Sequence, residues 1–103
     1  MSTRVNSLSC GLDFVGYVPF DVARRVADRI RLLLKDRLRD SLVGVVPWCE
    51  SPDRCVVKVL VARPEAVRTV AELLGLRIVD DSAEGVFEGV KVVVVVSRVG
   101  LLP

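Results

Sequence analysis

The sequence predicts an α+β fold in which two helices cover one face of an antiparallel sheet. Three observations lead to this prediction: runs of β-branched residues, two segments whose apolar residues recur every three or four positions, and a proline inside one β-branched run. The 103 residues suffice for one core, and a content of 51% hydrophobic and 27% charged residues is typical of chains that fold. We therefore expect one domain comprising residues 1–103.

A strand and a basic helix are predicted first. Residues 8–14 alternate between apolar and polar or small side chains, which is the pattern of a strand with one buried face. Asp21 is of a residue type that caps helix N-termini, so we predict a helix over residues 22–38. One side of this helix is an apolar stripe that should face the sheet. The other side carries seven cations: Arg24, Arg25, Arg29, Arg31, Lys35, Arg37 and Arg39.

A hairpin and a second helix follow. Residues 42–48 and 55–61 are β-branched runs joined by "CESPDR", which predicts two antiparallel strands with a short connection. Pro47 cannot donate a hydrogen bond to a neighbouring strand, so the first strand of the hairpin is predicted at a sheet edge. Pro64 at a first helical position and Gly75 beyond the last one delimit the second helix.

The last predicted elements are an extra short strand at residues 76–79, a turn at "DDSAEG" and a long strand at residues 90–99. Without the extra strand, the order is strand, helix, strand, strand, helix, strand. This βαββαβ order predicts a ferredoxin-like two-layer sandwich, with an antiparallel sheet and both helices on one face.

Two of the predicted strands are apolar on both faces. In the first, Val57, Val59 and Val61 face one side while Val56 and Leu60 face the other, and in the second Val92, Val94 and Val96 oppose Val93 and Val95. Two helices cover only one face of a sheet. We therefore expect the other face to associate with a second copy, as a homodimer, or with a partner protein. The alternative is a terminal segment that folds over the sheet, for which "VGLLP" is barely long enough.

The absence of histidine limits the chemistry that this chain can perform. Histidine is the commonest general base and metal ligand, and none occurs here. No cysteine pair has CxxC spacing, and no glycine pattern matches a phosphate-binding loop. We predict no metal, no cofactor and no catalysis. The acidic residues Asp80, Asp81, Glu84 and Glu88 are interpreted as a solvated turn, with magnesium binding or carboxylate catalysis as the alternative.

Cys49 and Cys55 flank the turn of the predicted hairpin. Residues at this position lie about as close as a disulfide requires, and intracellular proteins of hyperthermophiles do contain disulfides. A disulfide and two inert thiols are both compatible with the spacing. A disulfide would link the two ends of the loop that contains Glu50, Asp53 and Arg54.

Arginine dominates the charge of the chain. Twelve arginines and three lysines give a net charge of +2, and residues 1–63 carry eleven basic and seven acidic side chains. Arginine forks suit phosphate oxygens, and a basic face attracts nucleic acid through counterion release. The alternative is a solvated, partly salt-bridged helix face. The predicted RNA-binding residues are Arg24, Arg25, Arg29, Arg31, Lys35, Arg54 and Arg63.

Composition also bears on habitat and location. The excess of arginine over lysine, the few aromatic residues and the abundant valine suggest a thermophilic archaeon. The first residues contain no signal-peptide core, and the longest apolar run is too short to cross a bilayer. We therefore predict a cytoplasmic protein without membrane contact.

The chain resembles the small ferredoxin-like protein subunits of archaeal ribonuclease P. The matching pieces are "GVVPW" at residues 44–48, "VKVLVARPEAVRTVAELL" at 57–74 and "VKVVVVVSRVG" at 90–100, in the same order of elements. That group usually has a Ser-Gly-Thr type of turn and a basic segment after the last strand, whereas this chain has "SRVGLLP". The resemblance implies a non-catalytic RNA-binding subunit that associates with a partner protein through its sheet.

These observations predict a non-catalytic subunit that binds structured RNA or assembles a ribonucleoprotein. The alternative from another class is a dimeric regulatory or scaffolding domain that binds a small ligand or a protein and no nucleic acid. A third interpretation, an enzyme that acts through Asp80 and Asp81, lacks the residue types that most catalysis uses.

Overall fold

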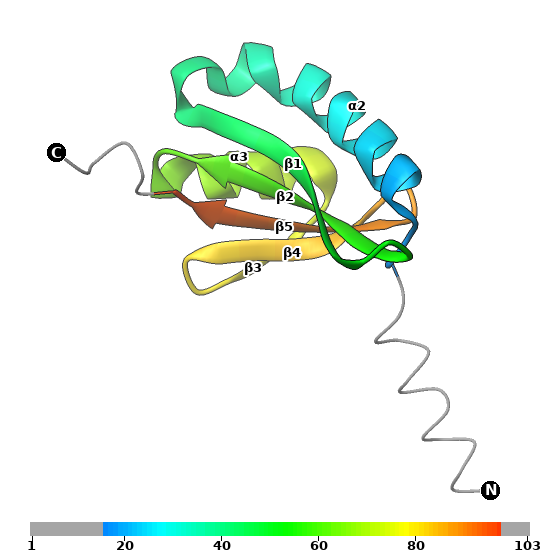
Figure 1. Cartoon of the computed structure of the whole chain (residues 1–103). Coiled ribbons are helices and arrows are strands. Elements are labelled where there is room, and N and C mark those ends of the chain that lie inside the picture. The colour runs from blue at the N-terminus through cyan, green and yellow to red at the C-terminus, as the bar shows by residue number, and fades with distance from the viewer. Residues whose placement is uncertain (1–15, 98–103) are drawn as a thin grey trace, which may run out of the picture.

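The computed structural model describes residues 16–97 (Figure 1). These residues form two α-helices and a five-stranded sheet, which confirms the predicted α+β class. The helices are α2 (Phe20–Leu38) and α3 (Pro64–Leu74), and a 3-10 turn, η1 (Arg39–Ser41), follows α2. The strands are β1 (Leu42–Ser51), β2 (Arg54–Val61), β3 (Arg77–Val79), β4 (Ser82–Phe87) and β5 (Val90–Val96).

The strands lie in the order β1-β2-β5-β4-β3. Strands β2 and β5 are parallel, whereas the other neighbouring pairs are antiparallel. The sheet is therefore mixed, and its order differs from the antiparallel ferredoxin-like order that we expected. The ferredoxin-like order would insert the strand predicted at residues 8–14 between β2 and β5, but β2 and β5 pair directly. Residues 8–14 themselves lie outside the described residues.

The edges of the sheet follow the sequence more closely than its centre does. Strand β1 lies at one edge, as Pro47 predicted, and β3 confirms the extra strand predicted at residues 76–79. The predicted "DDSAEG" turn is wrong beyond Asp80 and Asp81, because residue 82 begins strand β4. Alanine, glutamate and glycine, three of the six residues of β4, are depleted in strands. The strand forms nonetheless, since it pairs with β3 on one side and β5 on the other.

The helix ends agree with the sequence within two residues. Helix α2 begins at Phe20 after Pro19, whose extended conformation places it at the N-cap position, so the prediction of Asp21 as the N-cap is wrong. Asp21 lies in the first turn, where a negative charge is stabilised by the helix dipole. Helix α3 has Pro64 at its start and ends at Gly75, which adopts a left-handed conformation with φ of 72°.

Both helices pack on the same face of the sheet. Helix α2 covers β1 and β2, and α3 covers β3, β4 and β5 (Figure 1). Alternate residues of the central strands point into the core, and each fully buried valine stabilises the fold by roughly 1.5 kcal/mol. The cluster includes Ile30 and Leu34 of α2, Val67 and Val70 of α3, Val57 and Val59 of β2, and Val92 and Val94 of β5.

The opposite face of the sheet is not covered by either described helix (Figure 1). We call it the open face. It is not purely apolar, because lysines interrupt the valines of both central strands. Its side chains, assigned from strand register and alternation, include Val46 and Trp48 of β1, Val56, Lys58 and Leu60 of β2, Glu84 and Val86 of β4, and Lys91, Val93 and Val95 of β5.

Candidate nucleic-acid interface

The predicted cations of α2 do not form one surface. Arg24, Arg31 and Lys35 are seven and four residues apart and share one row of the helix. Arg25 and Arg29, four residues apart, share a different row. The first row adjoins β1, which Arg31 contacts, and the second adjoins the turn between β4 and β5, which Arg29 contacts.

Arg31 ties α2 to the edge strand. One of its guanidinium nitrogens donates a hydrogen bond to the carbonyl oxygen of Val45 over 2.8 Å. The other guanidinium nitrogen lies 3.2 Å from a carboxylate oxygen of Asp28, one helical turn earlier. A charged donor strengthens a hydrogen bond, so Arg31 has a structural role in holding α2 against β1.

Two further arginines of α2 have acidic partners. Arg29 forms an ion pair of 3.0 Å with Glu88 in the turn between β4 and β5, and Arg25 lies 4.0 Å from Asp21. The Arg25 pair is well exposed, so it adds little to stability. The acidic partners nevertheless reduce the net positive potential along this side of α2, which weakens its suitability as a phosphate-binding surface.

The other two predicted cations are far from α2 and from each other. Arg54 begins β2, whereas Arg63 follows its far end and occupies the N-cap position of α3. Because a strand of eight residues is roughly 26 Å long, no short ligand contacts both. The structure thus distributes the predicted RNA-binding residues over four regions: the two rows of α2, the start of β2 and the start of α3.

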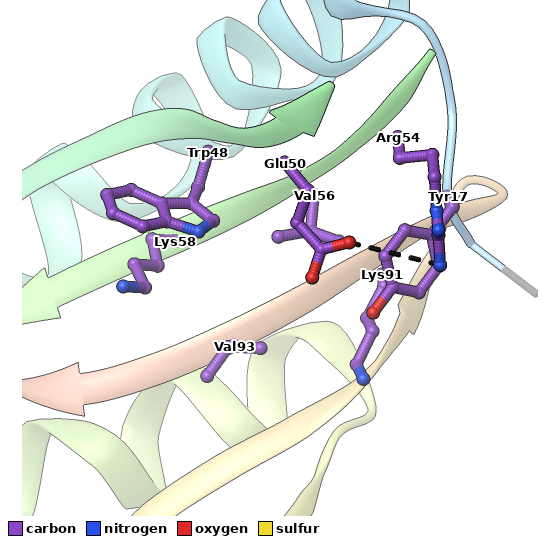
Figure 2. A pocket seen from close by; sticks show the side chains of 8 residues that line it. All are labelled: Tyr17, Trp48, Glu50, Arg54, Val56, Lys58, Lys91 and Val93. Carbon is purple, nitrogen blue, oxygen red and sulfur yellow. Dashed lines mark ion pairs between the residues drawn. The ribbon is translucent and has the colours of Figure 1, made fainter. Parts of the chain in front are cut away.

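One of these regions contains a pocket that the sequence analysis missed. It lies on the open face at the junction of β1, β2, β5 and the segment before α2, with a volume of about 170 Å³ (Figure 2). Of the predicted residues it includes Arg54 alone. The residues that line it are Tyr17, Trp48, Glu50, Arg54, Val56, Lys58, Lys91 and Val93. We call this set the sheet pocket.

Strand register explains why these residues share one face. Trp48 of β1 is opposite Val56 of β2, and Lys58, two residues further along β2, is beside Val93 of β5. Side chains two residues apart in a strand point to the same face, which adds Lys91 of β5. The alternation of residues along each strand shows in the sequence which side chains share a face. It does not show which strands are neighbours, so the pocket could not be predicted from the sequence.

Tyr17 reaches the pocket because its segment is attached to the end of the sheet. The carbonyl oxygen of Gly16 accepts a hydrogen bond of 2.8 Å from the amide of Lys91, and Val18 pairs with Cys55. Gly16 has a φ of 90°, and a Cβ atom there would lie 2.6 Å from the Lys91 nitrogen. A glycine is thus required for the close approach that places Tyr17 beside β5.

Cations lie against an aromatic ring at each end of the pocket. The Lys58 ammonium lies 3.9 Å from the centroid of the Trp48 ring. At the other end, the Arg54 guanidinium lies 5.4 Å and the Lys91 ammonium 5.7 Å from the centroid of the Tyr17 ring. Each distance is within the range of a cation–π interaction. Figure 2 shows the two groups with Glu50 and Val56 between them.

The sheet pocket carries a net positive charge. Arg54, Lys58 and Lys91 contribute three positive charges, and the one carboxylate is that of Glu50, which lies 3.9 Å from Arg54. Val56 and Val93 contribute an apolar surface between these groups. The combination of cations, exposed rings and an apolar surface suits an anionic ligand that also has flat aromatic parts.

A disulfide lies beneath the pocket. The structure joins Cys49 to Cys55 across β1 and β2, with 4.0 Å between their Cα atoms. Cys49 lies between Trp48 and Glu50, and Cys55 follows Arg54, so the bridge connects the two strands at the positions that carry three pocket residues. Cys55 is fully buried in the core. The bridge therefore limits how far β1 and β2 separate at the pocket.

We expect reduction of this disulfide to lower the free energy of unfolding by roughly 2 kcal/mol. The bridge joins residues only six apart, and a short loop loses less entropy on closure than a long one. Urea unfolding with and without a dithiol reductant measures the difference. The Cys49→Ala/Cys55→Ala variant should not respond to the reductant. Equal stability of the oxidised and reduced natural chain would contradict the prediction.

The acidic residues near the last turns do not converge. Asp80 and Asp81 form the turn between β3 and β4, Glu84 lies 3.6 Å from Arg77, and Glu88 belongs to the next turn. Within residues 16–97, no three histidine, cysteine, aspartate or glutamate side chains are placed to hold a metal ion.

No protein-family model matches the chain, and no curated protein or solved structure is significantly similar to it. The resemblance to ribonuclease P subunits therefore stays a prediction. Of the helices between residues 16 and 97, neither combines the length and hydrophobicity that a membrane-spanning helix needs.

Proposed function

We propose that this protein is a cytoplasmic, non-catalytic RNA-binding module whose RNA contact is the sheet pocket. The observation that carries the proposal is the convergence of three cations and two aromatic rings on one side of the sheet. The RNA contact in this module is on the open face and not on the arginine-rich side of α2. A role as a ribonucleoprotein subunit, which the resemblance to ribonuclease P proteins implies, is consistent with such a module.

The charges of the pocket support binding to the phosphate backbone. Lys58 and Lys91 come from the strands β2 and β5, which are hydrogen-bonded neighbours, so the backbone positions from which the two side chains extend are fixed on one surface. Arg54 adds a planar guanidinium that can donate two hydrogen bonds to one phosphate. A fixed backbone lowers the entropy lost on binding compared with cations on a flexible segment.

The ion pairs of α2 also favour the sheet pocket over α2 as the RNA contact. Arg25, Arg29 and Arg31 each lie within 4.0 Å of a carboxylate of the same chain. RNA contact there would require these pairs to open or would place phosphates near the carboxylates, and both reduce the gain from each arginine. In the sheet pocket, three cations face a single carboxylate.

A titration of RNA binding against salt tests the proposed function. The probe is a hairpin RNA with an unpaired loop and tail. Three phosphate contacts predict that the logarithm of the association constant falls with the logarithm of salt concentration with a slope of about 2 to 3. Electrostatic binding is strongest at low salt, so we expect it at about 50 mM salt. Absence of binding to the hairpin RNA at that concentration would exclude the proposed function.

A second candidate is the dimeric regulatory or scaffolding domain, which a different observation favours. Val46, Val79 and Val86 are among the exposed large hydrophobic residues, and all three are on strands at or near the edges of the sheet. Apolar side chains at a surface commonly bind another protein. Sedimentation equilibrium without RNA separates the two: a stable dimer favours this candidate, and a monomer that binds RNA favours the first.

A further inference from the structure

We propose that the RNA segment in the sheet pocket is unpaired and that one of its bases stacks on the indole ring of Trp48. This inference rests on the proposed function, since it specifies which form of RNA the pocket takes. It assigns Trp48 to a base, and it assigns Tyr17 with Arg54 and Lys91 to the adjoining phosphates.

Trp48 has the properties of a stacking platform. Its side chain projects from the edge strand β1 onto the open face, and 54% of its surface is exposed (Figure 2). A large ring left this exposed gains free energy when a flat aromatic group covers it. The Lys58 ammonium lies over one face of the indole, 3.9 Å from its centroid, so a stacked base would occupy the other face with a positive charge nearby.

The two ends of the pocket differ in a way that gives the ligand an orientation. One cation accompanies Trp48, whereas two accompany Tyr17. Glu50 offsets part of the charge at the Tyr17 end, but Arg54 and Lys91 still give that end two groups that donate hydrogen bonds to phosphate, whereas the end with Trp48 offers the more exposed ring. Trp48 on β1 and Lys91 on β5 are two strand spacings apart, about 10 Å, so the bound segment crosses the strands from β1 toward β5.

Stacking on a protein ring requires an unpaired base. In an RNA duplex each base is already stacked on its neighbours inside the helix, and the protein meets phosphates, ribose hydroxyls and a shallow groove. A pocket of about 170 Å³ with a ring at its rim offers a duplex only its cations. Unpaired bases can leave the strand and stack on tryptophan, and each such contact contributes substantially to affinity.

Trp48 is the one tryptophan of the chain, so its fluorescence reports directly on the proposed contact. The experiment titrates the full-length protein with a twelve-nucleotide oligoadenylate and, separately, with the duplex of that strand and oligouridylate. We expect the single strand to quench and bind, and the duplex to bind at least about fivefold more weakly without quenching. Equal affinities for both forms with unchanged fluorescence would overturn the proposal.

Substitution of Trp48 gives a second measurement. Trp48→Leu should lower the affinity for oligoadenylate by about 5- to 150-fold, whereas Trp48→Phe, which keeps a ring, should retain most of it. Circular dichroism establishes that both variants fold. Equal affinities of the Leu variant and the natural chain would contradict base stacking. If hairpin RNA still binds with a salt dependence in that case, the proposed function stands and only the stacking inference fails; if no RNA binds, both fail.

Discussion

The Lys58→Glu/Lys91→Glu variant should bind the hairpin RNA at least about 100-fold more weakly than the natural chain at low salt. Each substitution removes an attraction to phosphate and adds a repulsion. At about 4 Å in water, each of these is worth roughly 1 kcal/mol, so two reversals account for two or more factors of ten even after partial screening. Fluorescence anisotropy of a labelled hairpin RNA measures the loss.

A matched control uses the arginine-rich side of α2. Arg24→Glu/Lys35→Glu changes the net charge by the same amount, and both positions belong to the set predicted from the sequence. If the sheet pocket is the RNA contact, this variant should lose no more than about threefold in affinity through long-range electrostatics. A greater loss for the α2 variant than for the sheet variant would return the interface to α2.

The Ile30→Ala variant should lose about 3 kcal/mol of its free energy of unfolding. Ile30 is 0% exposed and belongs to the core cluster that joins α2 to the central strands. Its truncation removes apolar contacts and leaves a cavity that the valines of a rigid sheet fill incompletely. Urea unfolding followed by circular dichroism gives the difference in free energy.

Leu32 provides the control for this prediction. It lies two residues further along α2 and is 66% exposed, on the side of the helix away from the sheet. Leu32→Ala removes a side chain of the same size but should change the free energy of unfolding by less than about 0.5 kcal/mol. Comparable losses for the two variants would mean that α2 presents a different face to the sheet.

Helices and long strands could be predicted because their signals are local. Pro64 and Gly75 mark the two ends of α3 through backbone properties that do not depend on the rest of the fold. The valine-rich runs of β2 and β5 have the residues that strands prefer. Strand β4 could not be predicted in this way, because its residues have low strand propensity and it forms through pairing with β3 and β5.

The candidate site also combines features that are visible in the sequence with contacts that depend on the fold. Arginine is conspicuous in the sequence of α2, yet Arg29 contacts Glu88 from a distant turn and Arg31 bonds to the Val45 carbonyl. Both contacts depend on how α2 lies on the sheet. Conversely, Trp48 and Lys91 are far apart in the sequence and form no recognisable motif, but the fold brings them together in one pocket.

Local sequence features were sufficient to predict the α+β class, the edge position of β1, both helices and strand β3, since propensity, periodicity and proline chemistry act over a few residues. The parallel pairing of β5 with β2, which sets the strand order and assembles the sheet pocket, could be seen only in the folded protein. Pairing between strands separated by some thirty residues depends on the packing of both helices and of the whole sheet. No local pattern specifies it.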